Sequence, residues 1–426
     1  MSETRAEVPP GLEGREIEAF SLRGESFLFD VASGLALGAA AAHEAAASGV
    51  LAEVLDAAAA DEQPAPPPGR GHLALMWAGE CNLACTYCHA ETARQPGVEV
   101  EPQTLADTVS FAERLLGNGC ERVVFTFGFD GEPLLHLPRL RSLVEAVRQT
   151  GDARLRCSIT TNGTLLTPDR VKELERLEVD VGLSLDGPRE VHDAARRFPS
   201  GDPSYDAVLP GLFALRQSRL PSLRRVPAFV TLVPGIGRPA LVAEHLIDLG
   251  FHRFTMVPAR PRMGSGPVPG AQQTATLAET YGEYADRLLE ALAEGDRRFL
   301  AGINPGDLFG RSVLGLCRRS RSRYGCAAGR HEFAVGPDGA LYPCHAFYGA
   351  PKWACGSVSQ GLDATLATEF AEATVEAKSA CASCWARHLC GGGCVASAVV
   401  SGKGLRSPDE QRCALIRAVA REAVRL

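Results

Sequence analysis

Between residues 73 and 294 the sequence alternates short apolar runs with helix-like segments, and this alternation restricts the fold more than any other feature. The apolar runs predict six β-strands, over residues 73–77, 122–127, 155–161, 179–185, 228–233 and 253–257. The remaining segments predict helices, near residues 103–116, 137–149, 168–177, 205–217, 239–249 and 276–294. Strands that alternate with helices form a parallel sheet with right-handed crossovers. Six units are fewer than the eight of a closed barrel, so we expect an α/β fold, a partial (β/α)6 barrel.

The regions on either side of this alternation have a different character. Residues 17–30 predict a β-hairpin that turns at Arg23–Glu25, and the alanine-rich run over residues 35–60 has helical composition. The segment DEQPAPPPGR is proline-rich and predicts a linker. After about residue 300 the alternation ends and cysteines become frequent. We therefore expect four parts: a small N-terminal α+β module (1–60), the linker (61–70), the barrel (71–300) and a C-terminal Cys-rich domain (301–426).

Composition and charge exclude several classes of protein. The chain has 426 residues, of which 45% are hydrophobic and 22% charged, as in an ordinary globular protein. Its net charge of -7 argues against non-specific binding of nucleic acid, which requires a basic surface. No apolar run is long enough to span a membrane, and MSETRAEVPP at the N-terminus lacks the order of a secretory signal. The sequence thus predicts a cytoplasmic protein with no membrane or nucleic-acid partner.

The chain contains 14 cysteines, and their grouping indicates metal binding. The cytosol keeps thiols reduced, so disulfides are not expected. Cys81, Cys85 and Cys88 lie in CNLACTYC, directly after the first predicted strand. Three thiolates on one loop can hold three irons of a [4Fe–4S] cluster and leave the fourth iron open for a chelating cofactor. A zinc site normally recruits a fourth protein ligand, and a zinc knuckle is the alternative interpretation.

This loop, with Tyr87 before its last cysteine, resembles the signature of the radical S-adenosylmethionine (SAM) superfamily. GFDGEPLLH (128–136) resembles the Gly-Gly-Glu-Pro segment of that family, with Asp130 in place of its first glycine. TTNGTLLT (160–167) and SLDGPREVHDAAR (184–196) resemble its strand-end motifs. In this family the Gly-Gly-Glu-Pro backbone receives the amino group of SAM, and the Ser and Arg of the last motif contact SAM and its carboxylate. The resemblance implies SAM-binding residues Tyr87, Gly131, Glu132, Pro133, Asn162, Ser184 and Arg196.

A second group of cysteines occupies the C-terminal region. Cys-x12-Gly-x4-Cys precedes CASCWARHLCGGGC and a final cysteine, and this order resembles the seven-cysteine pattern of SPASM domains, which hold auxiliary [4Fe–4S] clusters. The resemblance implies that auxiliary cluster I takes Cys317, Cys326, Cys344 and Cys394. Auxiliary cluster II would take Cys381, Cys384, Cys390 and Cys413. If Cys317 is not a ligand, cluster I keeps an open iron for a substrate thiolate; if it is, both clusters are closed and suit electron transfer. A zinc ribbon is the alternative.

The segment YPCH (342–345) bears on the substrate. Most SPASM enzymes act on peptides or proteins, and this segment resembles maturases of ribosomal peptides and of a quinohemoprotein amine dehydrogenase subunit. Sulfatase maturases carry Asp where this chain has His345. The resemblance implies a catalytic role for His345, with hydrogen-bonded support of the cluster as the alternative. Residues 1–60 resemble modules that bind a leader peptide as an added strand, although a simple cap on the barrel is the other interpretation.

These observations predict a radical SAM maturase of a precursor peptide or protein. It would abstract a hydrogen atom from a side chain, form a thioether, C–C or C–O cross-link, and receive electrons from an external flavodoxin or ferredoxin. Three alternatives stay open: an anaerobic sulfatase-type maturase that makes formylglycine, a radical SAM enzyme with a small-molecule substrate, and a zinc-dependent binding scaffold without catalysis.

Overall fold

An eight-stranded sheet lies at the centre of the computed structural model, which describes residues 7–10, 12–60, 69–88, 97–260 and 271–426. Six of its strands are parallel and adjacent in chain order. They are β4 (Arg70–Leu75), β5 (Arg122–Phe127), β6 (Leu155–Thr161), β7 (Asp180–Ser184), β8 (Ala228–Leu232) and β9 (Phe254–Pro258). The six predicted strands are confirmed with shifts of at most a few residues at their ends.

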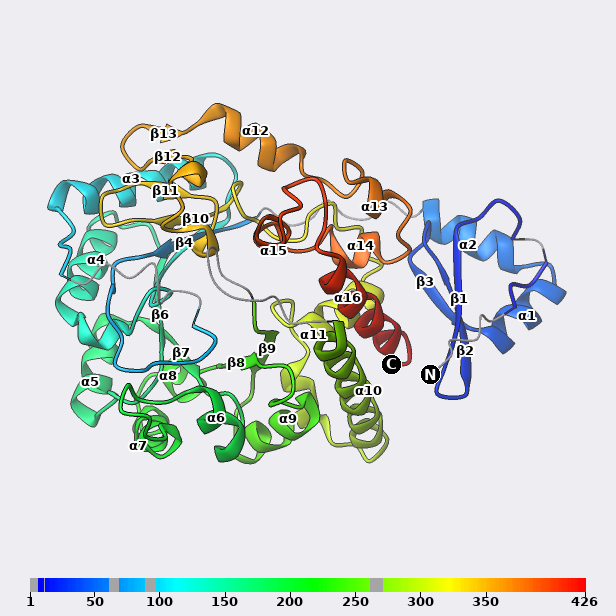
Figure 1. Ribbon diagram of the computed structural model, residues 1–426, viewed down its shortest axis with the longest axis horizontal. Helices are drawn as coiled ribbons and strands as arrows, with labels where there is room; N and C mark the ends of the chain where they lie inside the picture. Colours follow the sequence, from blue (N-terminus) through cyan, green and yellow to red (C-terminus); the bar gives the residue numbers. More distant parts are fainter. Residues whose placement is uncertain (1–6, 11, 61–68, 89–96, 261–270) are drawn as a thin grey trace.

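Helices follow the strands and lie around the outside of the arc that the strands form (Figure 1). They are α3 (Pro102–Gly117), α4 (Leu137–Gln149), α5 (Pro168–Leu177), α6 (Arg189–Ala195), α7 (Tyr205–Arg216), α8 (Pro221–Arg224), α9 (Pro239–Asp248) and α10 (Ala271–Ala293). Proline begins α3, α5 and α9, where its missing N–H costs nothing and its fixed φ suits the first helical turn. The predicted partial (β/α)6 barrel is confirmed.

Two further strands extend this sheet beyond β4. The strand β10 (Glu332–Val335) pairs in parallel with β4, with Phe333 opposite Leu73, and β11 (Leu341–Tyr342) pairs antiparallel with β10. The sequence did not predict these strands, because β10 has only four residues and follows the end of the strand–helix alternation. The Cys-rich region therefore completes one edge of the barrel sheet, while the domain limits given above stay a prediction.

The two faces of the strands carry different side chains. On β5, Val123, Phe125 and Phe127 are buried in the main apolar core, between the sheet and the helices. Thr126 points to the other face, where its hydroxyl lies 2.9 Å from His72 Nε2 and 2.7 Å from the Ser158 hydroxyl. Successive residues of a strand alternate between faces. The inner surface of the barrel thus carries polar side chains at β5 and its two neighbours, while its outer surface packs against the helices.

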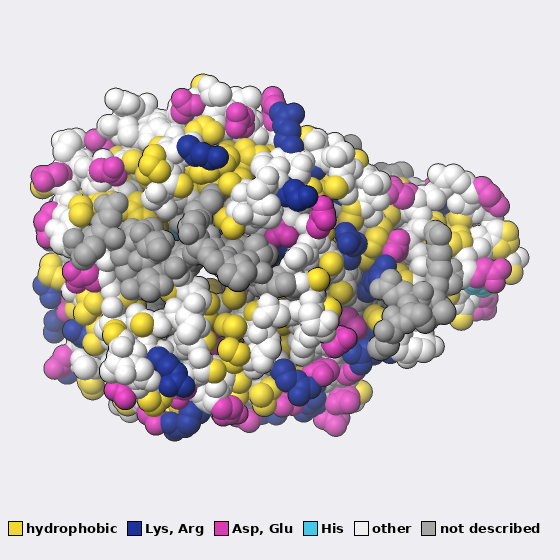
Figure 2. Space-filling view, in the orientation of Figure 1, with side chains coloured by type: hydrophobic (Ala, Val, Ile, Leu, Met, Phe, Trp, Pro, Cys, Tyr) yellow, Lys and Arg dark blue, Asp and Glu magenta, His cyan; other side chains and the backbone are white. Residues whose placement is uncertain are grey.

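The N-terminal module forms a separate lobe beside the barrel (Figures 1 and 2). Its three-stranded sheet and two helices are β1 (Ile17–Leu22), β2 (Glu25–Asp30), β3 (Leu35–Gly38), α1 (Ala39–Ala47) and α2 (Leu51–Ala60). The predicted hairpin is confirmed, and its turn has φ of 53° at Arg23 and 84° at Gly24, which matches a two-residue type I′ turn. The helical expectation for residues 35–60 was wrong at its start, because pairing with β2 makes residues 35–38 a strand.

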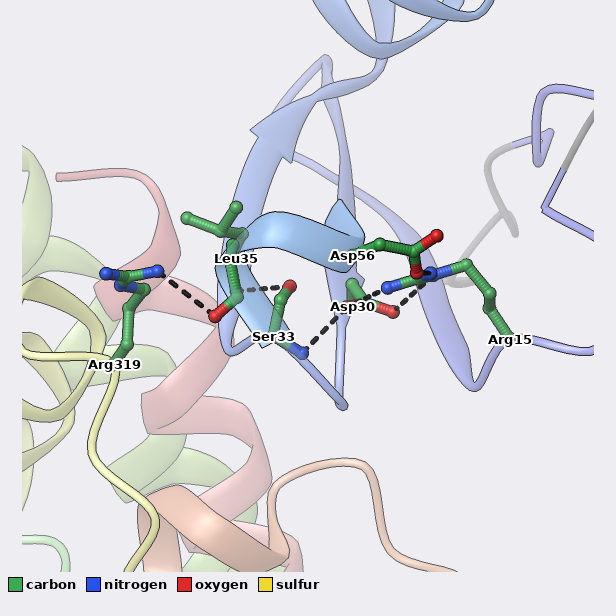
Figure 3. A network of polar contacts seen from close by, with 7 residues as sticks. Arg15, Asp30, Ser33, Leu35, Asp56 and Arg319 are labelled. Carbon is green, nitrogen blue, oxygen red and sulfur yellow. Dashed lines mark hydrogen bonds and ion pairs between the residues drawn. The ribbon is translucent and has the colours of Figure 1, made fainter. Parts of the chain in front are cut away.

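A polar network fixes the inside of this module (Figure 3). Arg15 donates hydrogen bonds of 3.2 Å to both carboxylate oxygens of Asp30 and also pairs with Asp56 of α2. Asp30 is 2% exposed and accepts a further bond of 2.8 Å from the Ser33 amide. The network joins the end of β2 to the turn before β3 and to the second helix.

Short elements dominate the Cys-rich region. These are η2 (Arg297–Gly302), α11 (Leu308–Cys317), η3 (His345–Phe347), η4 (Pro351–Trp353), β12 (Gly356–Ser357), β13 (Gly361–Leu362), α12 (Ala364–Glu372), α13 (Ser379–Ala382), α14 (Arg387–Cys390), α15 (Val395–Val400) and α16 (Glu410–Val424). The long helix α16 packs against α10 and α11, and so joins this region to the barrel. Within the described ranges, no helix has both the length and the apolar character needed to cross a membrane.

Candidate functional site

The loop that carries Cys81, Cys85 and Cys88 follows β4 and is anchored by the segment after β5. Asp130 is 1% exposed, and its carboxylate accepts backbone N–H bonds from Ala78 (3.2 Å) and Gly79 (2.9 Å). The acid at this unusual position therefore fixes the approach to the cysteine loop.

Gly131 lies beside this anchor and has no room for a side chain. A Cβ at this position would lie 2.1 Å from the carbonyl oxygen of Glu80, and the Glu132 amide donates to the same oxygen at 2.7 Å. Two stretches of backbone are thus packed against each other directly before the first cysteine. Glycine is the residue that permits such a close approach.

Glu132 connects the ends of β5 and β6. Its buried carboxylate accepts bonds from the Thr161 hydroxyl (2.7 Å) and the Asn162 amide (2.8 Å), and it caps the short helix that begins at Pro133. Burial raises the pKa of this carboxyl above its ordinary value, and these hydrogen bonds oppose the shift. The side-chain nitrogen of Asn162 lies 3.9 Å from Cys81 Sγ. Glu132 thus holds Asn162 beside the first cysteine.

Tyr87 of the loop forms a polar cluster with the buried side chains of Asp186 and Arg196. The Tyr87 hydroxyl donates to Asp186 at 2.5 Å and accepts from Arg196 at 2.5 Å, and the Thr231 amide donates to Asp186 at 2.9 Å. Burial raises the pKa of the Asp186 carboxyl, and the positive charge of Arg196 opposes that shift. Arg196 Nε is buried without a hydrogen-bond partner in the part of the chain that the structure describes. The cluster therefore offers a cationic N–H donor near Cys85.

Most of these residues follow the carboxyl ends of parallel strands, which is where open α/β sheets bind ligands, and Arg196 comes from the end of α6. Ser184 is the last residue of β7 and lies at the same edge of the sheet. Burial raises the pKa of Cys85, and the charges of Cys88 and Cys81 raise it further, so the thiols are close enough to interact. Three grouped thiols, the close backbone approach at Gly131 and the unpaired Arg196 Nε fit a [4Fe–4S] cluster with a chelated amino acid. The predicted first site is thus brought together in space.

In the Cys-rich region, Cys326, Cys344 and Cys394 line one cavity of about 110 Å³. Arg260 and Arg412 line it too, and Arg260 Nη1 lies 4.0 Å from Cys394 Sγ. Burial raises the pKa of Cys394, but the two guanidinium groups, together with hydrogen bonds from Ser397, bring it below its ordinary value. Burial raises the pKa of the other two thiols, Cys326 and Cys344, so the cationic side of the cavity favours the thiolate of Cys394 alone. The sequence reasoning missed both arginines, and the only signal for Arg412 was its position next to a cysteine.

Cys317 does not line this cavity. It ends α11 and is exposed to solvent, as is Cys326, so only the lining of the cavity distinguishes the two. Three of the four thiols assigned to auxiliary cluster I thus line one cavity, and the fourth is not part of its lining.

The four thiols assigned to auxiliary cluster II form a separate group. Burial raises the pKa of Cys413 to about 12, and the charges of Cys390, Cys381 and Cys384 contribute to the shift. Among the described residues, no three His, Cys, Asp or Glu side chains converge tightly enough to bind one metal ion. The four thiols are close enough to interact electrostatically, and in a cube each iron takes its own thiolate.

His345 lies between this region and the barrel. Its ring stacks on Phe129 with 4.5 Å between centroids, and its Nδ1 lies 3.9 Å from Glu332, which is also 3.8 Å from His72. Glu332 and His345 line the same cavity as the three cysteines. The sequence reasoning missed Glu332, because it lies on β10, whose pairing with β4 was not predicted.

Comparison with known proteins agrees with this geometry. Residues 77–240 match the Radical SAM superfamily. The chain is 27% identical over 345 residues to the mycofactocin maturase MftC of Mycolicibacterium smegmatis. The aligned residues make up 78% of this chain and 79% of MftC. It is 25% identical over 340 residues to the cysteine-type anaerobic sulfatase-maturating enzyme of Clostridium perfringens strain 13. This alignment covers 74% of this chain and 85% of that enzyme. A solved structure of anSMEcpe with bound AdoMet has the same fold, with a TM-score of 0.66, 20% identity, and coverage of 83% of this chain and 96% of that one.

The fold and the cysteine loop agree with the match of residues 77–240 to the Radical SAM superfamily, whose members are enzymes of radical redox chemistry. The match implies SAM and one [4Fe–4S] cluster as cofactors. The relatives that cover most of this chain include two maturases, one for mycofactocin and one for sulfatases.

Proposed function

We propose that this enzyme is a maturase that forms a cross-link in a ribosomally made peptide or protein. The observation that carries the proposal is the position of the Cys-rich region, which contributes β10 to the barrel sheet. Through β10 and η3, this region brings Glu332 and His345 against the inner side of the barrel. A second redox centre in the Cys326 cavity would then lie close to the site of hydrogen abstraction.

The electron balance of a cross-link requires such a second centre. When bound, SAM and its cluster supply a 5′-deoxyadenosyl radical that removes one hydrogen atom from the substrate. A thioether, C–C or C–O bond forms only when a second hydrogen leaves, as a proton and an electron. We propose that His345 takes the proton and that an auxiliary cluster takes the electron. Arg196 would hold the carboxylate of SAM, and the backbone of Gly131–Pro133 its amino group.

The SPASM assignment of the cysteines is part of this proposal. Cys326, Cys344 and Cys394 would hold auxiliary cluster I, and the second thiol group would hold cluster II. Cys317 is the proposed eighth ligand, and its exposed position outside the cavity makes it the first assignment to test. Iron loading of a Cys317→Ala variant separates a closed cluster I from one with an open iron.

Substrate delivery would use the N-terminal module. Its small sheet and its helices suit the binding of a leader peptide as an added strand. The module packs directly on the Cys-rich region, where Trp385 contacts Phe20 and Phe29 at 6.2 and 5.6 Å between ring centroids. A leader bound there would be held beside the auxiliary clusters. An external flavodoxin or ferredoxin would supply the electrons.

A second candidate is the formation of formylglycine in a sulfatase. It is favoured by the shared fold with anSMEcpe, a structure of which holds AdoMet and the Cp18Cys peptide. His345, in place of the aspartate expected for sulfatase maturases, argues for the cross-link. The two reactions differ in their products, since formylglycine carries an aldehyde.

Iron and sulfide analysis after anaerobic reconstitution tests the cofactor part of the proposal. The wild-type chain should hold about twelve irons, and a Cys81/Cys85/Cys88→Ala variant about eight. Reductive formation of 5′-deoxyadenosine should be lost in the variant. A wild-type value of about four irons would refute the auxiliary clusters, and bound zinc with little iron would refute the radical chemistry.

Mass spectrometry of co-expressed peptides tests the reaction itself. The enzyme is expressed with each short reading frame that adjoins its gene, and the peptides are analysed with and without an aldehyde-reactive hydrazide. A peptide that has lost two hydrogen atoms and does not react with the hydrazide supports the cross-link. A hydrazide-reactive product supports the sulfatase-type reaction instead.

A further inference from the structure

Lys378 is a basic side chain buried within the Cys-rich region. It is 2% exposed, and its ammonium donates one hydrogen bond of 2.9 Å to the carbonyl oxygen of Gly392. An ammonium has three N–H donors. Among the described residues, no carboxylate lies within ion-pair distance of it, in contrast to Lys403 on the surface, which pairs with Glu410 at 3.2 Å.

A buried charge without a counter-charge is expensive. Removing an ammonium from water costs several kcal/mol even after the protein relaxes, unless an opposite charge compensates it. The peptide carbonyl of Gly392 supplies only a dipole. The buried ammonium of Lys378 therefore needs a nearby anion, and among the described residues this anion is not a carboxylate.

The surroundings of Lys378 identify this anion as a cysteine-bound group. Its own carbonyl accepts the amide N–H bonds of Cys381 (2.8 Å) and Ala382 (3.0 Å), and so holds the loop of the first thiol. Its ammonium reaches the glycine loop between Cys390 and Cys394. One side chain thus bridges two loops that carry thiols of the second group.

We propose that Lys378 is the buried counter-charge of auxiliary cluster II and raises its reduction potential. The inference rests on the proposed assignment of Cys381, Cys384, Cys390 and Cys413 to that cluster. A [4Fe–4S] core bound by four thiolates is an anion, and reduction adds one more negative charge to it. The net charge around a cluster is one of the factors that set its potential. A fixed ammonium stabilises the reduced form more than the oxidised form, so Lys378 prepares cluster II to accept an electron.

The test compares Lys378→Met, Lys378→Arg and a matched control, Lys403→Met, which removes the same charge from the surface. Each is made in the full chain with the Cys81/Cys85/Cys88→Ala background, so that only auxiliary clusters contribute to the spectra. The midpoint potentials are measured by redox titration with electron paramagnetic resonance. In Lys378→Met the midpoint potential of one auxiliary cluster should become more negative by at least about 59 mV. This shift is a tenfold change in the equilibrium constant of a one-electron reduction. Lys378→Arg and Lys403→Met should retain the parent value.

Thermal unfolding with and without iron separates a counter-charge from an ordinary structural hydrogen bond. Lys378→Met should lower the melting temperature of the iron-loaded chain but leave the iron-free chain as stable as its parent or more so. An unchanged midpoint, or an equal loss of stability in both forms, would overturn the inference. Lys378→Met could fail to bind a second auxiliary cluster. In that case, binding of the cluster by Lys378→Arg supports the role of the positive charge, and absence of the cluster from both variants refutes that role. A parent chain without auxiliary clusters would refute the proposed function rather than the role of Lys378.

Discussion

The barrel and the Cys-rich region are stabilised in different ways. Each barrel strand from β4 to β9 has five to seven residues and contributes to one continuous apolar core with the helices outside it. Between residues 318 and 409 the longest helix, α12, has 9 residues, and β11, β12 and β13 have two residues each. The apolar cluster that belongs to this region alone contains Ala328, Cys344, Phe347, Phe370, Ala373, Val395, Ala396 and Leu405.

The smaller apolar core of the Cys-rich region suits a region that the proposed auxiliary clusters would stabilise. A large apolar core stabilises the barrel whether or not a cluster is bound. A small core of this kind rarely suffices alone, and metal binding then supplies folding free energy. We expect the Cys-rich region to depend on its clusters, and the barrel to provide a stable scaffold on which they assemble.

Removal of iron should have the largest effect. In the iron-free chain, amide hydrogen exchange over residues 381–394 should accelerate by two orders of magnitude or more, because few buried contacts remain to protect these loops. Exchange in β5 and β6 should change little. Hydrogen-exchange mass spectrometry of the two forms measures both. Equal acceleration in the barrel strands and the loops would abolish the distinction between the regions.

Two phenylalanines sharpen the comparison. Phe125 is fully buried in the barrel core, and Phe347 is fully buried in the small cluster, where it contacts Trp353 and Phe370. Phe125→Ala should cost about 3–5 kcal/mol of unfolding free energy with or without iron. Phe347→Ala should cost a similar amount only in the iron-loaded chain. Urea denaturation of the four samples checks this, and an iron-independent loss for Phe347→Ala would contradict the expectation.

The smallest effect concerns the contact between the N-terminal module and the Cys-rich region. Arg387 donates two hydrogen bonds of 2.5 Å to Glu16, and they lower the pKa of that carboxyl. A lowered pKa in the folded state gives stability that is present at neutral pH and is lost as the pH falls through the folded pKa. Because Glu16 is half exposed, Glu16→Gln should cost no more than about 1 kcal/mol at pH 7.

Denaturation of the iron-loaded chain, followed by circular dichroism at several pH values, measures this contribution of Glu16 to the free energy of unfolding. The difference between wild type and Glu16→Gln should disappear in acid. A difference that persists below the folded pKa of Glu16 would show that the carboxylate acts through packing rather than through its charge.

Local patterns were sufficient to predict the barrel. The strand over residues 155–161 and the helices over 137–149 and 168–177 were predicted with their observed bounds, because each is a short buried run or an amphipathic segment with clear ends. Residues 35–38 were missed because the sequence LALG suits a helix as well as a strand, and pairing with β2 decides between them. The short helix α6 was also missed.

The site residues also divide into those that a local sequence pattern predicts and those that it does not. The spacing of the three cysteines on one loop was readable from the sequence, because their contacts are local. Glu332 and Arg260 acquire their surroundings from segments far away in the chain, and no local pattern marks them. Lys378 contacts a loop only 14 residues away, but its burial follows from the packing of the whole region. The position of Cys317 outside the cavity likewise depends on how α11 packs, which spacing does not encode.

The pairing of β4 with β10 has a consequence for how the chain is made. Leu73 and Leu75 lie opposite Phe333 and Val335, so the outer edge of β4 stays unpaired until the ribosome has synthesised the whole barrel and the start of the Cys-rich region. At ordinary rates of synthesis this delay is on the order of tens of seconds. An open strand edge is a template for association with other chains. A nascent chain stalled near residue 300, or a protein cut there, should therefore need a chaperone to stay in solution, even though its six predicted strand–helix units are complete.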